Sequence, residues 1–362
     1  MSGLKIISVV GARPQFIKAA PVCRALRENH EEILVHSGQH YDYAMSDVFF
    51  EQLGIPTPDF NLAVGSGSHA RQTGEMMPML ETLFEEQNAD VVLVYGDTNT
   101  TLAAGLAAAK IGIPVAHVEA GLRSFNRSMP EEINRIVVDH VSELLLVPTR
   151  AGVANLAAEG ITDGVHLVGD VMLDTARFFA ENVEAADTLV AFEVEPGGFY
   201  FATVHRAGNS DSASNLAGIV EAFSQLDKPV IWAVHPRTLK NLEAFGLLER
   251  AEAAENIRMV PPVSYIETVS LLRNSAGLLT DSGGMQKEAY FFGVPCVTLR
   301  EETEWVETVE LGWNRLTGAD TNRIIAGVAG MARPAGRPAV YGDGHAAEEI
   351  CAALERRFGV GR

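Results

Sequence analysis

The chain has 362 residues, 47 % of them hydrophobic, and so exceeds the about 100–200 residues at which single domains usually stop. Its formal net charge of −19 argues against nucleic acid as a partner, because binding to phosphates requires a basic face. No window approaches the roughly 20 apolar residues that cross a membrane, so no membrane is expected as a partner either.

The start of the chain and its cysteines indicate a compartment. The sequence passes within its first residues into an apolar run and shows no signal peptide. Cys23, Cys296 and Cys351 are scattered, without the paired spacing of a disulfide framework or a zinc site. We therefore expect a soluble, cytoplasmic protein without a bound metal.

Short apolar runs rich in β-branched residues recur along the chain and predict strands. In the first half they cover residues 6–10, 33–37, 91–95, 115–118, 144–147 and 166–168, and in the second half 199–203, 230–234, 257–259, 277–280 and 295–298. Helical segments lie between most of these runs. Strands that are continuously apolar, rather than alternating, indicate parallel sheets covered on both faces.

This order of elements predicts an α/β protein with two Rossmann-type, doubly wound parallel-sheet domains that face each other across a cleft. Residues 1–170 form the first domain and residues 171–345 the second, and a C-terminal helix at 346–362 packs back on the first. Ligands of parallel sheets bind at the carboxyl ends of the strands. The residues that follow each predicted strand are therefore the candidate site.

The segment GARPQFIK at residues 11–18 follows the first predicted strand. It contains neither the three-glycine dinucleotide fingerprint nor a P-loop. It does supply a turn glycine and two cations, Arg13 and Lys18, near the start of a helix. A capped helix with solvated basic residues explains the same pattern, but in so acidic a chain we favour a role in binding an anion.

Carboxylates follow the next central strands. Asp97 comes directly after the run at 91–95 and is either a helix N-cap or a catalytic group; taken alone, the cap is favoured. Glu119 ends the run at 115–118, and Glu131 and Glu132 open a helix behind Pro130, where glutamates usually complement the helix dipole. Carboxylates at adjacent strand ends can nevertheless converge on one site as acid and base.

The second half offers cations at the corresponding positions. His205 and Arg206 follow its first predicted strand, and His235 and Arg237 follow the next. A lone histidine is more often structural than catalytic. Two such pairs at successive strand ends instead suggest a cationic wall opposite the carboxylates.

The segment LTDSGGMQKEA at residues 279–289 reads as a strand, a turn and a helix. Ser282, Gly283 and Gly284 lie at the turn, where the first N–H groups of the helix lack internal partners and favour an anion. Glu288 lies on the first turns of the same helix, within reach of a ribose. A tight turn with Ser282 as an ordinary N-cap is the equally supported alternative to a nucleotide diphosphate site.

Seven segments together resemble the non-hydrolysing UDP-N-acetylglucosamine 2-epimerases. They are, in order, GARPQFIKAAP, GDTNTTLA, HVEAGLRS, MPEEINR, TVHR, AVHPRT and LTDSGGMQKEA. The resemblance implies a GT-B-like fold, a homodimer, and neither a metal nor a nicotinamide cofactor. It also implies reversible inversion at C2 of a UDP-2-acetamido sugar, through elimination of UDP to a 2-acetamidoglucal and re-addition, with polysaccharide biosynthesis as the expected setting.

The resemblance also assigns roles to residues. Asp97, Glu119 and Glu131 match the catalytic acids, and His205 matches an active-site histidine near the phosphate. Nucleotide-binding positions are matched by Arg13, Lys18, Ser282, Gly283, Gly284 and Glu288, with Glu288 on the ribose. Gln39, Arg206 and His235 resemble positions that line a second, activating site in some bacterial members.

Three positions depart from the family pattern and leave the sugar open. Gly208 replaces a glutamate, Trp305 replaces an arginine of the substrate site, and Thr268 stands near the place of a phenylalanine at the uracil. The GARPQ and TEW features resemble a branch that acts on UDP-2,3-diacetamido-2,3-dideoxyglucuronate. We expect UDP-N-acetylglucosamine as substrate, with that uronate as the alternative.

Two further classes of protein remain as rivals. A GT-B glycosyltransferase shares the fold and the donor, and a non-catalytic UDP-sugar sensor would keep the turn at 282–284. Neither requires acid and base groups at C2, so the carboxylates argue against both. An epimerase that hydrolyses its product is a variant of the first reading.

Overall fold

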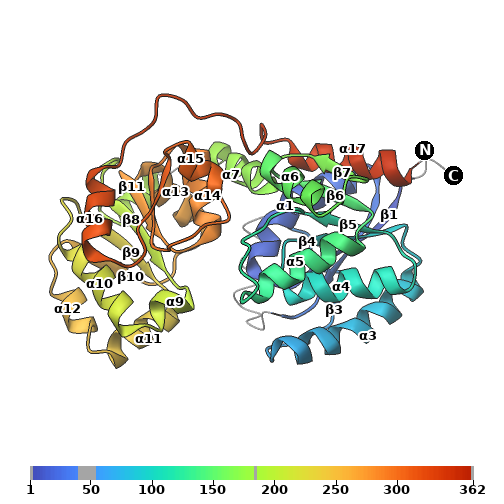
Figure 1. The fold of residues 1–362 in the computed structure, drawn as a ribbon, viewed down its shortest axis with the longest axis horizontal. Coiled ribbons are helices and arrows are strands. Elements are labelled where there is room, and N and C mark those ends of the chain that lie inside the picture. The colour runs from blue at the N-terminus through green and yellow to red at the C-terminus, as the bar shows by residue number, and fades with distance from the viewer. Residues whose placement is uncertain (1–2, 40–53, 183–185, 360–362) are drawn as a thin grey trace. The chain divides into compact units, whose positions relative to one another are not determined.

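The computed structural model describes residues 3–39, 54–182 and 186–359, and the side chain of Arg13 lies outside this description (Figure 1). The chain forms two compact units. The first contains Met1–Arg177 together with Ala339–Arg362, and the second contains Phe178–Pro338. No helix among the described residues is both long and apolar enough to cross a membrane.

The first unit is built on a parallel sheet of seven strands in the order β3-β2-β1-β4-β5-β6-β7 (Figure 1). The strands are β1 (Lys5–Val10), β2 (Glu31–His36), β3 (Phe60–Asn61), β4 (Val91–Tyr95), β5 (Val115–Val118), β6 (Leu144–Val147) and β7 (Val165–Leu167). Every residue of the strands β4, β5 and β6 is buried, including His117 in β5, the one polar residue in their otherwise apolar sequence. The strand order reverses beside β1, where doubly wound folds place their ligands.

Helices cover this sheet. They are α1 (Arg13–Asn29), α3 (His69–Gln87), α4 (Asn99–Lys110), α5 (Pro130–Val141), α6 (Arg150–Ala158), most of α7 (Val171–Asn182) and α17 (Ala346–Phe358). Local sequence explains their starts: Thr98 caps α4 by accepting a hydrogen bond from Thr101 N, and Pro130 opens α5 at a position that needs no N–H.

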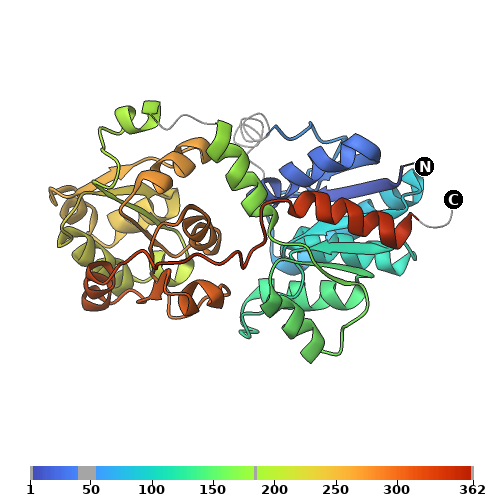
Figure 2. The same ribbon diagram turned by 90° about the horizontal axis from the view of Figure 1, so that it is seen from above.

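The C-terminal helix α17 lies on the first unit, against α1 (Figure 2). Asp174 holds it there by accepting hydrogen bonds from Ala346 N at 3.2 Å and Ala347 N at 2.8 Å. Thr175 Oγ1 donates to Ile17 O at 2.8 Å, which ties the start of α7 to α1. The observed division at 177/178 therefore runs through α7, whereas the division expected at 170/171 places α7 wholly in the second unit.

The second unit contains a parallel sheet of six strands in the order β10-β9-β8-β11-β12-β13. The strands are β8 (Tyr200–Val204), β9 (Val230–Val234), β10 (Ile257–Val260), β11 (Gly277–Thr280), β12 (Cys296–Thr298) and β13 (Asn314–Leu316). Its helices are α8 (Ala186–Ala191), α9 (Ala207–Ser210), α10 (Ala213–Ser224), α11 (Pro236–Ala244), α12 (Leu248–Glu252), α13 (Tyr265–Asn274), α14 (Gly283–Phe292), α15 (Val306–Glu310) and α16 (Thr321–Ala329).

Alternate residues of β8 enter separate cores on the two faces of this sheet. Ala202 and Val204 belong to one core, in which Phe223 meets Trp232 edge to face at 5.4 Å, and Phe201 belongs to the other. Because both faces are buried, the carboxyl ends of the strands are where this unit can present polar groups.

Candidate active site

Asp97 and Glu119 lie at the carboxyl ends of β4 and β5, which are neighbours in the first sheet. Thr98, not Asp97, is the N-cap of α4, so the Asp97 carboxylate does not serve as the cap that its sequence position favoured. The turn before Asp97 lies close to the Glu119 carboxylate, because a Cβ added at Gly96 would be 3.3 Å from Glu119 Oε2. The structure thus brings two of the predicted catalytic acids to one sheet edge.

The backbone of Glu119 adopts a conformation that glutamate rarely takes. Its φ of 72° lies in the left-handed region, and hydrogen bonds from Glu119 N and Ala120 N to Leu146 O, at 3.0 Å and 3.3 Å, hold the turn to β6. Strained backbone of this kind persists where the surrounding structure over-determines it, typically at functional sites.

Each of these carboxylates has a buried cation as partner. Lys18 Nζ, on α1, pairs with Glu119 Oε2, and the side chains are 10 % and 7 % exposed. Arg135, on α5, pairs with Asp97, which is 28 % exposed. Lys18, predicted at the nucleotide, is thus paired with one of the predicted catalytic acids in this structure.

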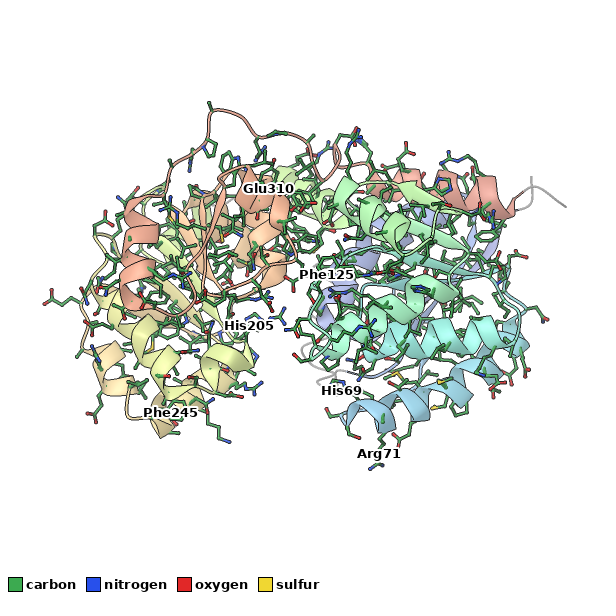
Figure 3. The ribbon with its side chains drawn as sticks, in the orientation of Figure 1. His69, Arg71, Phe125, His205, Phe245 and Glu310 are labelled. Atoms are coloured by element: carbon green, nitrogen blue, oxygen red, sulfur yellow. The ribbon has the colours of Figure 1, made fainter. Side chains whose placement is uncertain are left out.

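The adjacent glutamates of α5 differ in role. Glu132 is buried and accepts hydrogen bonds from Ser124 N, Phe125 N and Arg135 Nη1, each at 2.9 Å (Phe125 is labelled in Figure 3). Glu131 is half-buried, and neither a hydrogen bond nor an ion pair joins it to another described residue. Glu132 thus holds the loop before α5, which leaves Glu131 available to a ligand.

Gln15 fastens the turn after β1, a role that the sequence did not reveal. Its Oε1 accepts hydrogen bonds from Gly11 N and Ala12 N at 2.9 Å and 3.0 Å, and its Nε2 donates to Tyr95 O at 2.9 Å.

Gln39 Oε1 accepts a hydrogen bond from Thr100 Oγ1 at 2.7 Å. The predicted anion-binding side chain of Arg13 lies outside the described residues.

In the second unit, the turn between β11 and α14 has the predicted form. Ser282 is the N-cap of α14, with its hydroxyl accepting a hydrogen bond from Met285 N at 3.5 Å. The preceding Asp281 is fully buried and accepts hydrogen bonds from His205 N and Arg206 N, each at 3.0 Å. This aspartate, overlooked in the sequence, joins the two turns that carry the predicted phosphate-side residues.

Three side chains surround the first turn of α14. A Cβ added at Gly283 would lie 3.5 Å from Trp305 Nε1, 3.7 Å from Glu304 Oε2 and 3.9 Å from Arg206 Nη2. Glu304 pairs with Arg300 at 3.1 Å. Burial alone would raise the pKa of the Glu304 carboxyl, but the charges of Arg300 and Arg206 hold that pKa below its usual value. The first turn of α14 is therefore flanked by a carboxylate, a guanidinium and an indole.

Trp305 has a buried partner of its own. The Nζ of Lys287, a side chain only 1 % exposed, lies 4.0 Å from the centroid of the Trp305 ring. A desolvated ammonium over an indole face is stabilised by about 2 kcal/mol. Trp305, which stands where the family has an arginine, thus makes a cation–π contact within the second unit.

Three further positions singled out in the sequence are Glu288, Thr268 and Gly208. Glu288 is buried, and its Oε1 accepts a hydrogen bond from Tyr265 Oη at 2.9 Å. Thr268 Oγ1 donates to Ser264 O, one turn back in α13. Gly208 is exposed, and a Cβ added there would meet no atom within 4 Å, so its departure removes a side chain from an open position.

His205 is held between an acid and a second histidine. Its Nδ1 lies 3.4 Å from Asp281 Oδ1, and its ring centroid lies 6.0 Å from that of His235 (Figure 3). Burial lowers the pKa of the His205 imidazole, Asp281 opposes that effect, and Arg206 and His235 add to it. Gln39, Arg206 and His235 belong to different units, and the activating site that they suggest stays a prediction.

The described part of the chain contains no candidate metal site. Within residues 3–39, 54–182 and 186–359, no cluster of three or more histidine, cysteine or carboxylate side chains is arranged to hold a metal ion.

Two parallel-sheet α/β units, one with carboxylates at its central strand ends and one with a Ser-Gly-Gly helix start, define a GT-B-like protein. The family model described as UDP-N-acetylglucosamine 2-epimerase matches residues 24–355. The chain belongs to the UDP-N-acetylglucosamine 2-epimerase family, which confirms the resemblance drawn from its motifs.

Among curated relatives, the UDP-N-acetylglucosamine 2-epimerase homolog of Methanococcus maripaludis is 47 % identical, over 97 % of this chain and 99 % of its own. The UDP-2,3-diacetamido-2,3-dideoxy-D-glucuronate 2-epimerase of Pseudomonas aeruginosa is 48 % identical, over 89 % and 90 %. The UDP-GlcNAc 2-epimerase of Methanocaldococcus jannaschii, solved with UDP-GlcNAc and UDP, has a TM-score of 0.89 at 40 % identity, covering 98 % of this chain and all of that one.

The different roles of Glu131 and Glu132 lead to a prediction about stability. Glu132→Gln should lower the free energy of unfolding of the first unit by about 1–3 kcal/mol, because buried donors lose a charged acceptor. The matched Glu131→Gln variant should stay within about 0.5 kcal/mol of the wild type. Urea unfolding followed by circular dichroism measures both; equal losses would contradict the assignment.

The pKa shift of His205 leads to a second prediction. Since burial is the main cause and lowers the pKa, the imidazole should titrate below about 6.5 and be neutral at pH 7. NMR titration of the ligand-free protein, with His205→Asn used to assign the signal, gives the midpoint directly. A midpoint above the usual histidine value would show that Asp281, rather than burial, dominates.

Proposed function

We propose that the protein is an isomerase that interconverts UDP-N-acetylglucosamine and UDP-N-acetylmannosamine by inversion at C2. The observation that carries the proposal is the placement of Asp97 and Glu119 at neighbouring strand ends, each with a buried cation. Membership of the epimerase family supports it as well. Neither a glycosyltransferase nor a sugar sensor requires acid and base groups at C2 of the sugar.

The C2 proton of such a sugar has no adjacent carbonyl, so its direct removal is difficult. In the elimination route, a carboxylate takes the C2 proton, the bond between C1 and the diphosphate oxygen breaks, and UDP leaves behind a 2-acetamidoglucal. Re-protonation of C2 on the opposite face and re-addition of UDP at C1 complete the inversion. Each well-placed acid or base contributes about 10²–10⁴-fold to the rate.

We assign the proton transfers to Asp97, Glu119 and Glu131. The leaving diphosphate is assigned to His205, to the α14 turn at 282–284 and to Arg13, with Glu288 at the ribose. The start of α14 supports this assignment, because the first N–H groups of a helix favour an anion. The neutral state expected for His205 lets it donate without adding a full charge.

The family resemblance is also the basis for a proposal about assembly and setting. We infer a cytoplasmic homodimer that serves polysaccharide biosynthesis. Light scattering in solution should give twice the mass of one chain, and the mass of a single chain would refute the dimer.

The reaction is tested in deuterated water. Incubated with UDP-N-acetylglucosamine, the protein should place deuterium at C2 and give UDP-N-acetylmannosamine, both followed by proton NMR. Exchange only with UDP-2,3-diacetamido-2,3-dideoxyglucuronate would transfer the assignment to that substrate. Free sugar and UDP as the main products would indicate hydrolysis, and no exchange with either substrate would refute epimerase activity.

The Asp97→Asn variant tests the role of Asp97 in the same assay. It keeps the size of the side chain and removes the charge, so exchange should be abolished while the affinity for UDP, measured by calorimetry, is kept. A comparable loss of UDP affinity would instead identify Asp97 as a structural residue.

A further inference from the structure

His117 lies in β5 and is completely buried behind the predicted carboxylates. Both ring nitrogens make short hydrogen bonds: Nε2 lies 2.7 Å from Gly96 O, and Nδ1 lies 2.7 Å from Asp139 Oδ1, on α5. The sequence drew attention to Glu119, two residues further on, and gave His117 no role.

Both partners of this imidazole are acceptors. A backbone carbonyl cannot donate, so Nε2 carries a proton. Asp139 Oδ2 accepts hydrogen bonds from Arg123 Nη1 at 2.7 Å and from Gly121 N at 3.1 Å, as an ionised carboxylate does. Burial alone would raise the pKa of the Asp139 carboxyl, but His117 and Arg123 hold it below its usual value. Asp139 thus links His117 to Arg123 and to the turn after Glu119.

Arg123 joins the network to a second carboxylate. It makes a two-fold contact with Glu159, with Nε and Nη2 each 2.7 Å from a carboxylate oxygen. Arg123 thus pairs with two carboxylates, Asp139 and Glu159. Buried charges persist when they are paired and hydrogen-bonded in this manner.

The network joins the two turns that bear the catalytic carboxylates. Gly96, whose carbonyl accepts from His117, directly precedes Asp97, and Gly121, whose N–H donates to Asp139, follows Glu119 by two residues. In a planar trans peptide the C=O and N–H groups point in opposite directions. The bond to Gly96 O therefore also fixes the direction of the Asp97 N–H and of the chain that follows.

We propose that His117 acts as a positioning residue, holding the turns of Asp97 and Glu119 in register with each other through its bonds to Gly96 O and Asp139. It acts on the reaction only through these turns, and this part rests on the proposed epimerase function. Its hydrogen bond to Gly96 O does not rest on that function, so the two are tested separately.

The hydrogen bond to Gly96 O is tested on the wild-type protein. With ¹⁵N-labelled histidine, Nε2 of His117 should carry a proton, because its partner Gly96 O can only accept. His30 and His36 are internal references, because their Nδ1 atoms accept hydrogen bonds from Leu4 N at 3.2 Å and Gly38 N at 2.9 Å. An unprotonated Nε2 on His117, assigned by the loss of its signal in His117→Gln, would overturn the proposal.

The positioning role is tested by kinetics. His117→Phe should lower kcat for C2 exchange about 100-fold, as expected for a small misplacement of reacting groups, without changing the affinity for UDP. His117→Gln should retain more activity, since its amide can still donate to Gly96 O. A folded His117→Phe variant with wild-type kcat, or one that loses UDP affinity in proportion, would overturn the role.

The two experiments separate the possible failures. If the wild type acts on neither sugar, the proposed function fails while the NMR result still decides whether His117 donates to Gly96 O. If His117→Phe does not fold, the NMR result and the His117→Gln variant carry the test.

Discussion

Ion pairs between carboxylates at the strand ends and buried cations shape the first unit. The chain carries 47 acidic against 28 basic residues, so cations are scarce, and several of them are placed inside rather than on the surface. Lys18 brings α1 to the end of β5, and Arg135 brings α5 to the end of β4. The same contacts that neutralise the acids also fix the helices that surround them.

Most of the fold could be predicted from the sequence because its central strands are continuous apolar runs. The strands that the runs did not predict lie at sheet edges. β3 has two residues, both exposed, and β13 reads Asn-Arg-Leu, with too little apolar sequence to stand out. Edge strands contact the core on one side only, so their composition is weakly constrained, and pairing with a neighbour rather than pattern defines them.

The candidate site was predictable where a chemical group follows an apolar run, as Asp97 and Glu119 do. The residues that hold the site in shape were not, because their partners are distant in the chain. Gln15 reaches Tyr95 O, and Asp281 reaches the backbone of His205. Nor does sequence distinguish Glu131 from Glu132, since the difference depends on the N–H groups of a loop that only the fold places beside one of them.

At Glu119 the left-handed backbone conformation is unfavourable for folding, whereas the proposed reaction uses the carboxylate at this position. Glycine adopts that conformation freely, whereas a residue with a Cβ gives up about 1–2 kcal/mol there. A chain selected only for stability would therefore carry glycine after β5. The carboxylate that stands there instead is a local cost of folding, which the buried network around β4, β5 and α5 offsets.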